Sequence, residues 1–98
     1  MVVGDLDGTS ADPRLVELVV THLRELDYRV SVNDPYKGAT IVRRYGMPAR
    51  GCSTIQIEIN RALYLDEASV EPTPGYSKLK SSLESLMTAL AAGARRDA

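Results

Sequence analysis

Isoleucines alternate with polar residues from Thr54 to Asn60, in the order Thr-Ile-Gln-Ile-Glu-Ile-Asn. Successive side chains of a β-strand point to opposite faces of the sheet, so this alternation predicts one apolar and one polar face. We expect a strand over residues 52–61 whose isoleucines enter a core. The opposite face carries Gln56 and Glu58, and it borders either solvent or a cleft that holds a polar ligand.

Hydrophobic spacing predicts two amphipathic helices. Apolar residues recur at three- and four-residue intervals from Leu15 to Leu26, where Asp12 would cap the helix and Pro13 would be its first residue. A second stripe runs from Tyr76 to Leu90, and Gly93 is expected to end that helix. We expect both stripes to pack against a sheet.

Three further strands are expected, over residues 1–4, 28–32 and 39–45. The resulting order of elements predicts an α/β fold with a small mixed sheet of about four strands and two packing helices. A chain of 98 residues suffices for one small domain. We assign that single α/β domain to residues 1–93 and expect a disordered tail over residues 94–98.

Net charge, cysteine count and the absence of targeting segments indicate which partners and which cellular compartment to expect. The formal net charge of −1 provides no field that would recruit nucleic acid or an anionic membrane. The sequence shows no signal peptide and no apolar run of membrane length, and its single cysteine excludes an internal disulfide. We therefore expect a soluble, cytoplasmic protein whose partners must be inferred from its sites.

Short motifs surround the predicted strand in a characteristic order. They are Asn33-Asp34-Pro35-Tyr36-Lys37-Gly38, Arg43-Arg44-Tyr45-Gly46, Pro48-Ala49-Arg50-Gly51, Gln56-Ile57-Glu58-Ile59-Asn60-Arg61 and Ala62-Leu63-Tyr64-Leu65-Asp66-Glu67. In this order and spacing the chain resembles the C-terminal part of the N-formylglutamate amidohydrolases. These zinc-dependent hydrolases release formate from N-formyl-L-glutamate at the end of histidine degradation. The resemblance runs from about Gly4 to about Gly75.

The resemblance implies a fold and a general base. The fold would be of the phosphorylase and hydrolase type, related to zinc carboxypeptidases, and this chain would be its C-terminal segment. Glu58 looks like the strand glutamate that serves as general base beside the metal in zinc carboxypeptidases. A solvent-facing or salt-bridged glutamate is the alternative interpretation of Glu58.

The substrate that the resemblance implies is a small dianionic formyl-amino acid. Carboxylates call for guanidinium groups, which bind them with two parallel hydrogen bonds, and we favour Arg43 because the family pattern is firmest there. Arg43 and Arg44 would face opposite sides of a strand, so only one of them would reach the cleft. Asn33 and Tyr36, at a strand end and in its turn, and Gln56 on the polar face complete the predicted substrate-binding set. For Asn33 the alternative is simple closure of a turn.

No zinc site is expected in this chain alone. A catalytic zinc needs three protein ligands, whereas the chain has one histidine and one cysteine. His22 lies on the predicted helix as a packed residue, and Cys52 is expected to be a small buried hydrophobe. The family's zinc ligands belong to its earlier part, so the isolated chain is expected to be inactive. Ser53, where members commonly have histidine, and Ala39, where they have a second glycine, also depart from the family pattern.

Two other functions compete with this one. Asp5-Leu6-Asp7-Gly8-Thr9 follows an apolar run and matches the nucleophile loop of haloacid-dehalogenase-type phosphatases, in which Asp5 would attack phosphorus and Asp7 would act as acid and base. That chemistry also needs a magnesium-binding acidic pair, and Asp66-Glu67 is the only later candidate. The other alternative is a non-catalytic binding or interaction module derived from the family. Such a module would expose surfaces that favour a homo-oligomer or a missing N-terminal half as partner.

Overall fold

The computed structural model describes residues 1–97, apart from the side chains of Ile41 and of residues 94–97. Contacts divide the chain into two compact units, one over Met1–Glu58 and one from Ile59 onward. Both helices and short sheets are present, so the α/β class is confirmed. The assignment of one domain to residues 1–93 stays a prediction.

The first unit contains a three-stranded sheet. Its strands are β1 (Val2–Gly4), β2 (Ser31–Val32) and β3 (Gln56–Glu58), in the order β2-β1-β3. β1 pairs in parallel with β2 and antiparallel with β3, so the sheet is mixed, as expected. Each strand is shorter than its sequence pattern, and the apolar side chain of Val3 at the centre is fully buried.

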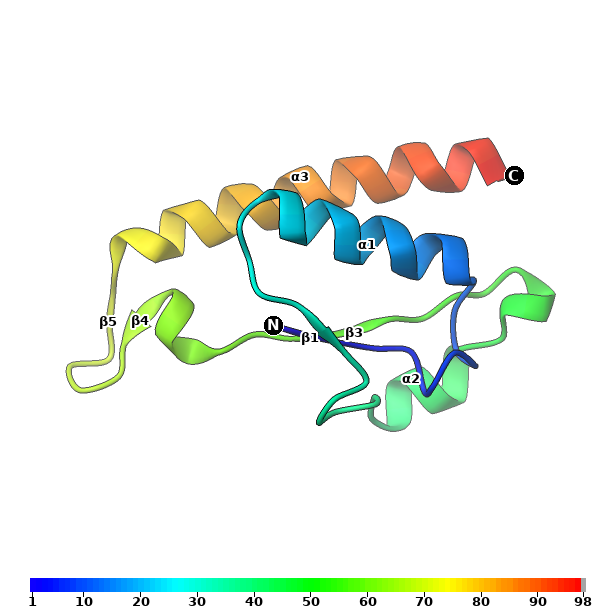
Figure 1. Ribbon diagram of the computed structural model, residues 1–98, viewed down its shortest axis with the longest axis horizontal. Coiled ribbons are helices and arrows are strands. Elements are labelled where there is room, and N and C mark those ends of the chain that lie inside the picture. The colour runs from blue at the N-terminus through cyan, green and yellow to red at the C-terminus, as the bar shows by residue number, and fades with distance from the viewer. Residues whose placement is uncertain (98) are drawn as a thin grey trace. The chain divides into compact units, whose positions relative to one another are not determined.

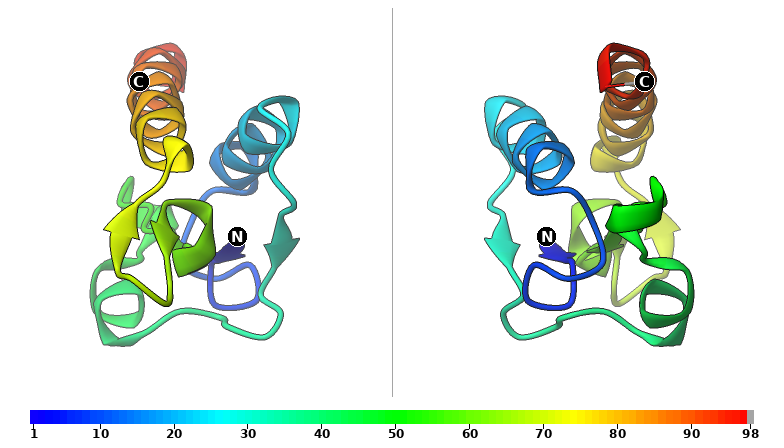
Figure 2. Two further views of the ribbon diagram at one scale, coloured as in Figure 1. Left: turned by 90° about the vertical axis from the view of Figure 1, so that its left-hand side faces the viewer. Right: turned by 90° about the vertical axis from the view of Figure 1, so that its right-hand side faces the viewer.

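Helix α1 (Pro13–Glu25) has the expected bounds and cap. The carboxylate of Asp12 accepts a hydrogen bond from the backbone N–H of Arg14, and proline occupies the first turn. The predicted apolar stripe is buried at Val16, Val19, Val20 and Leu23. Figures 1 and 2 show α1 on one side of the strands of this unit and α2 on the other.

Residues Thr40–Tyr45 form helix α2, so the prediction of a strand over residues 39–45 is wrong. The β-branched residues in this segment favour a strand, but such preferences are weak and are overridden when a helix buries a key side chain. Here the side chain of Val42 is 2% exposed, and its carbonyl accepts a hydrogen bond from Gly46 N at 2.9 Å. Arg43 and Arg44 therefore lie about 100° apart on a helix and do not face opposite sides of a strand, contrary to expectation.

The strand expected over residues 52–61 is also shorter in the structure, because only Gln56–Glu58 is paired. Its isoleucines are half-buried and none belongs to the buried core. Cys52 is exposed, contrary to expectation. The backbone of Cys52 pairs with Met47 in an isolated antiparallel bridge that closes the loop around a short 3₁₀-helix, Pro48–Arg50, and this pairing does not require its side chain to be buried.

The second unit begins with a 3₁₀-helix at Arg61–Leu63, followed by the hairpin of β4 (Leu65–Asp66) and β5 (Glu71–Pro72), which was not predicted. Helix α3 then spans Pro74–Asp97 and does not stop at Gly93. A single glycine costs only about 1 kcal/mol relative to alanine in a helix, and the alanines around it have the highest helix propensity. The disordered tail was expected over residues 94–98. The structure does not describe the side chains of residues 94–97, and Ala98 lies outside the described residues altogether. No helix in the described chain is both long and apolar enough to cross a membrane.

Candidate functional site

The polar face of β3 lies beside a strand position that has no side chain. In the antiparallel register Gln56 is opposite Gly4 and Glu58 is opposite Val2, so these four positions share one face of the sheet. A Cβ atom on Gly4 would approach the carbonyl oxygen of Lys37 to 2.7 Å. The segment after β2 therefore crosses this face against the backbone of Gly4, and only glycine leaves room for it.

Gln56 joins Glu58 to the start of α2. Its side-chain nitrogen Nε2 donates a hydrogen bond to Oε1 of Glu58 at 2.7 Å. Its side-chain oxygen Oε1 accepts a hydrogen bond from the backbone nitrogen of Ala39 at 2.9 Å. Two residues singled out from the sequence, Gln56 and Glu58, are thus in direct contact, and Glu58 itself is exposed.

Asn33 joins the ends of the two parallel strands. Asp5 follows β1 and Asn33 follows β2 at the same edge of the sheet. Asn33 Nδ2 donates to Asp5 Oδ1 at 2.6 Å, and Asp5 N donates to Asn33 Oδ1 at 2.9 Å. The same carboxylate oxygen of Asp5 accepts from Gly8 N at 2.8 Å. Both ends of the Asn33 amide are therefore hydrogen-bonded to Asp5. Asp5 is a buried residue with only 6% of its surface exposed.

Tyr36 and Arg43 lie on the two segments that flank Ala39. Tyr36 belongs to the segment between β2 and α2 and is 56% exposed. Arg43 is an exposed residue in the last turn of α2, beside Arg44, whose guanidinium lies 5.6 Å from the ring centre of Tyr45. The structure thus places all of the predicted substrate-binding residues in the first unit, with Tyr36 and Arg43 accessible to a ligand.

Two serines contribute contacts that the sequence did not indicate. Ser53 Oγ accepts a hydrogen bond from Asp12 N at 2.9 Å. Ser10 is fully buried, and its hydroxyl donates to the carbonyl of Thr54 at 2.7 Å. Both tie the segment before β3 to the start of α1. No periodicity marks such contacts, since their partners are 41 and 44 residues away.

The loop after β1 does not present the geometry of a phosphatase nucleophile. The Asp5 carboxylate is buried and accepts two hydrogen bonds, and the Asp7 carboxylate forms an ion pair with Lys37 at 3.0 Å. The first side chain caps the loop, and the second joins it to the segment after β2. This arrangement favours the capping interpretation of both aspartates.

The described residues do not fit a catalytic zinc centre. No group of three or more His, Cys, Asp or Glu side chains in the described chain is placed to hold a metal ion. His22 is half-buried on α1, and Cys52 is exposed in a loop of the same unit. The Asp5 carboxylate already serves as an acceptor for Asn33 and Gly8.

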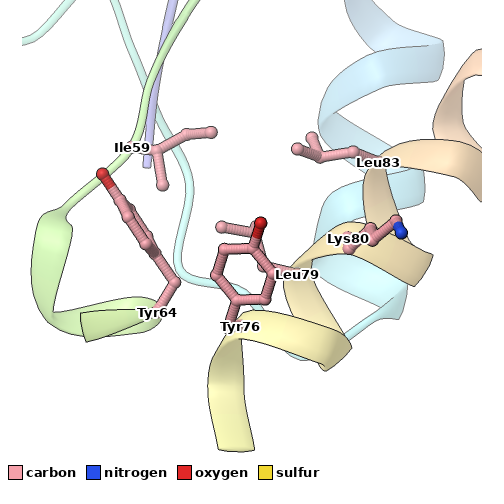
Figure 3. Close-up of a pocket in the computed structure, with 6 residues that line it drawn as sticks. All are labelled: Ile59, Tyr64, Tyr76, Leu79, Lys80 and Leu83. Atoms are coloured by element: carbon pink, nitrogen blue, oxygen red, sulfur yellow. The ribbon is translucent and has the colours of Figure 1, made fainter. Parts of the chain in front are cut away.

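A separate pocket lies within the second unit, shown in Figure 3. Its volume is about 290 Å³, and its lining is mainly apolar. The lining residues are Ile59, Tyr64, Tyr76, Leu79, Lys80 and Leu83. Three of these residues come from the apolar stripe predicted for the last helix, so this part of the stripe lines a pocket open to the surface.

Comparison with known proteins gives consistent matches to one family. A family model described as N-formylglutamate amidohydrolase matches residues 1–65. An N-formylglutamate deformylase of Pseudomonas putida is 33% identical over 66 residues, which are 66% of this chain and 25% of that protein. A second match is the crystal structure of an N-formylglutamate amidohydrolase from Ralstonia eutropha JMP134, with a TM-score of 0.93 and a sequence identity of 42%. The matched region covers 99% of this chain and 35% of that protein chain. The chain thus spans about a quarter to a third of the length of these relatives.

Proposed function

Since the chain belongs to the N-formylglutamate amidohydrolase family, we propose that it supplies the general base and part of the substrate-binding wall of an amidohydrolase site. The reaction would be hydrolysis of N-formyl-L-glutamate to L-glutamate and formate, as a step of histidine degradation. The observation that carries the proposal is the contact between Gln56 and Glu58 on the polar face of β3. An exposed Cys52 thiol also suits a reducing compartment such as the cytoplasm.

Glu58 is the proposed general base. A carboxylate offers about four acceptor sites, so the bond from Gln56 leaves capacity to accept a proton from water. As that water attacks the formyl carbon, Glu58 would take its proton, and the carbon–nitrogen bond would then break. The proton would pass from Glu58 to the departing amine nitrogen, which regenerates the carboxylate and releases formate and glutamate.

The substrate is a dianion, and the first unit offers groups of suitable chemistry. We assign Arg43 to one substrate carboxylate, because its exposed guanidinium can form two parallel hydrogen bonds. Tyr36 would contribute a hydroxyl from the segment before α2. Asn33 and Gln56 each keep a second amide N–H beyond those used within the protein, so both retain a donor for the ligand.

The proposed site would use a zinc ion whose binding requires residues from outside the described chain. The described residues do not provide three ligands, so the zinc that the family resemblance implies would need donors from outside residues 1–97. When bound, zinc would polarise the formyl carbonyl or activate water. The 98-residue chain on its own is accordingly expected not to release formate.

A graft tests the assignment of Glu58. Residues 1–97 would replace the matching 35% of the Ralstonia eutropha protein, and formate release from N-formyl-L-glutamate would be measured beside the unmodified parent. Glu58→Gln in the active graft should lower kcat by about 100- to 10,000-fold, the usual contribution of a general base, while KM changes little. Glu71→Gln, which alters an exposed glutamate of β5, should leave turnover unchanged. Near-normal kcat in Glu58→Gln would refute the assignment.

The alternative is a binding or interaction module without catalysis. Exposed aromatic and apolar side chains at Tyr36, Tyr45 and Met47 favour it, because such residues mark contact surfaces. Calorimetric titration of the isolated chain with N-formyl-L-glutamate separates the two. A graft that never releases formate, together with an isolated chain that still binds the ligand, would support the module.

A further inference from the structure

We infer that Gln56 is a positioning residue of the amidohydrolase site, which holds the Glu58 carboxylate and the start of α2 in one fixed arrangement. This inference rests on the proposed function, because the position of Glu58 matters for catalysis only if Glu58 is the base. The geometry behind it stands independently. One side-chain amide makes both a 2.7 Å bond to Glu58 and a 2.9 Å bond to Ala39.

The two partners determine how the Gln56 amide is oriented. A backbone N–H can only donate, so the oxygen of the Gln56 amide must face Ala39. An ionised carboxylate can only accept, so the nitrogen must face Glu58. A glutamine satisfies both at once, whereas a glutamate would satisfy only the first and would place two carboxylates side by side.

The bond to Ala39 resembles half of a capping box. In a capping box, the third residue of a helix reaches back with a Glu or Gln side chain to the backbone N–H of the N-cap residue. Ala39 is the N-cap of α2 and has no side chain that could cap the helix. Gln56 provides the reciprocal bond from β3, 17 residues away in sequence, and so fixes where α2 begins.

Gln56 therefore connects the proposed base, Glu58, with the segments that carry the proposed substrate contacts. Tyr36 precedes Ala39 by three residues, and Arg43 follows it by four within α2. Any displacement of Ala39 therefore moves the segments that carry both proposed substrate contacts. Because the same side chain holds Glu58, Gln56 sets the position of the base relative to the bound substrate.

Solution NMR on the 98-residue chain tests the arrangement without any need for activity. Gln56 is the chain's single glutamine, so its side-chain amide signals are identified directly. In the wild type, these protons should exchange with solvent about 3- to 10-fold more slowly than those of Asn60, consistent with one additional hydrogen bond. Equal exchange rates for the two side chains would overturn the inference.

Two substitutions separate the two bonds. Gln56→Glu keeps the acceptor for Ala39 but removes the donor to Glu58. We expect amide exchange at Ala39 to stay within about 3-fold of wild type, while side-chain couplings show Glu58 averaging over rotamers. Gln56→Ala should release both, with Ala39 exchange accelerated about 3- to 10-fold. Asn60→Ala serves as the control, since Asn60 caps the following 3₁₀-helix.

The outcomes distinguish this inference from the proposed function. A Glu58 side chain that keeps one rotamer in Gln56→Glu would overturn the positioning role even if Glu58 proves to be the base. If the Gln56 variants lose the ordered geometry as expected but Glu58→Gln of the graft keeps full turnover, the proposed function and the catalytic meaning of the positioning fall together, while the Gln56–Glu58–Ala39 arrangement itself stands. If Gln56→Ala fails to fold, the wild-type exchange rates and Gln56→Glu still decide.

Discussion

Two amide side chains, Asn33 and Gln56, hold together segments that are distant in sequence. Asn33 bonds Asp5 across 28 residues, and Gln56 bonds Ala39 across 17. In each side chain the amide oxygen accepts from a backbone N–H and the amide nitrogen donates to a carboxylate, so one planar amide group makes both bonds. At the scale of single residues, the candidate site is therefore built on amide-to-carboxylate contacts.

Replacing Asn33 should destabilise the first unit. Asn33→Ala removes two hydrogen bonds and leaves the buried Asp5 carboxylate with fewer donors, which costs about 1–3 kcal/mol when a buried group loses its partner. Urea unfolding at neutral pH measures the difference. Asn60→Ala, which removes an exposed cap, is the comparison and should cost no more than about 1 kcal/mol. Equal losses in the two variants would contradict the role assigned to Asn33.

The cap of α1 should make stability depend on pH. Hydrogen bonds from the side chain and then the backbone of Arg14 hold the pKa of Asp12 below its ordinary value of 3.8. A carboxyl group with a lowered pKa in the folded state stabilises the protein above pH 3.8, and this stabilisation is lost as the pH falls through the folded pKa. Asp12→Asn keeps an acceptor but removes the charge. At pH 7 we expect the urea midpoint of unfolding to be higher for the wild type than for Asp12→Asn. At pH 3 the difference between the two midpoints should be smaller. A difference that does not change with pH would contradict the role of the Asp12 charge.

At the scale of elements, α2 and the β4–β5 hairpin are the parts that differ most from the sequence expectation. The segment Thr40–Tyr45 has the residues of a strand, but it forms a helix capped from β3. The hairpin is only two residues deep on each side, and the carboxylate of Asp66 organises its turn by accepting from the backbone of Ala68 and Ser69. Both elements depend on hydrogen bonds more than on a hydrophobic pattern.

The hairpin should be stabilised by a change at Val70. This β-branched residue has φ of +59°, a left-handed conformation that costs about 1–3 kcal/mol for a residue of this kind. Because its side chain is 67% exposed, little packing is lost on replacement. Val70→Gly should therefore raise the free energy of unfolding by about 1 kcal/mol in thermal or urea melts. Ala68→Gly, in the same turn, should instead lower it slightly, and the opposite pattern would argue against strain at Val70.

At the scale of the whole molecule, stability depends on a small number of buried residues. A chain of 98 residues is expected to have a free energy of unfolding of roughly 5–15 kcal/mol. The largest apolar side chains with almost no exposure include Val3, Val19 and Leu23 in the first unit and Leu86 in the second. Large apolar residues such as Tyr76 and Met87 remain 49% and 65% exposed. Exposure of this kind favours association with another surface.

Truncating the core should remove a large share of the stability. Leu23→Ala deletes a fully buried side chain from α1 and should cost about 2–5 kcal/mol through lost burial and the cavity left behind. Val32→Ala, at a residue that is 40% exposed, should change stability by less than about 1 kcal/mol. Urea denaturation monitored by circular dichroism checks both. Similar midpoints for the two variants would show that Leu23 is not part of a packed core.

The sequence alone determined helix α1 with its Asp12 cap, the mixed α/β class and the family, because these depend on local spacing and on ordered motifs. The helix at residues 40–45, the exposure of Cys52 and the contacts of Gln56 with Glu58 and Ala39 became visible only in the folded chain. Periodicity records which face of an element is apolar, but a hydrogen bond between residues far apart in the chain depends on how the fold brings them together, which no local pattern encodes.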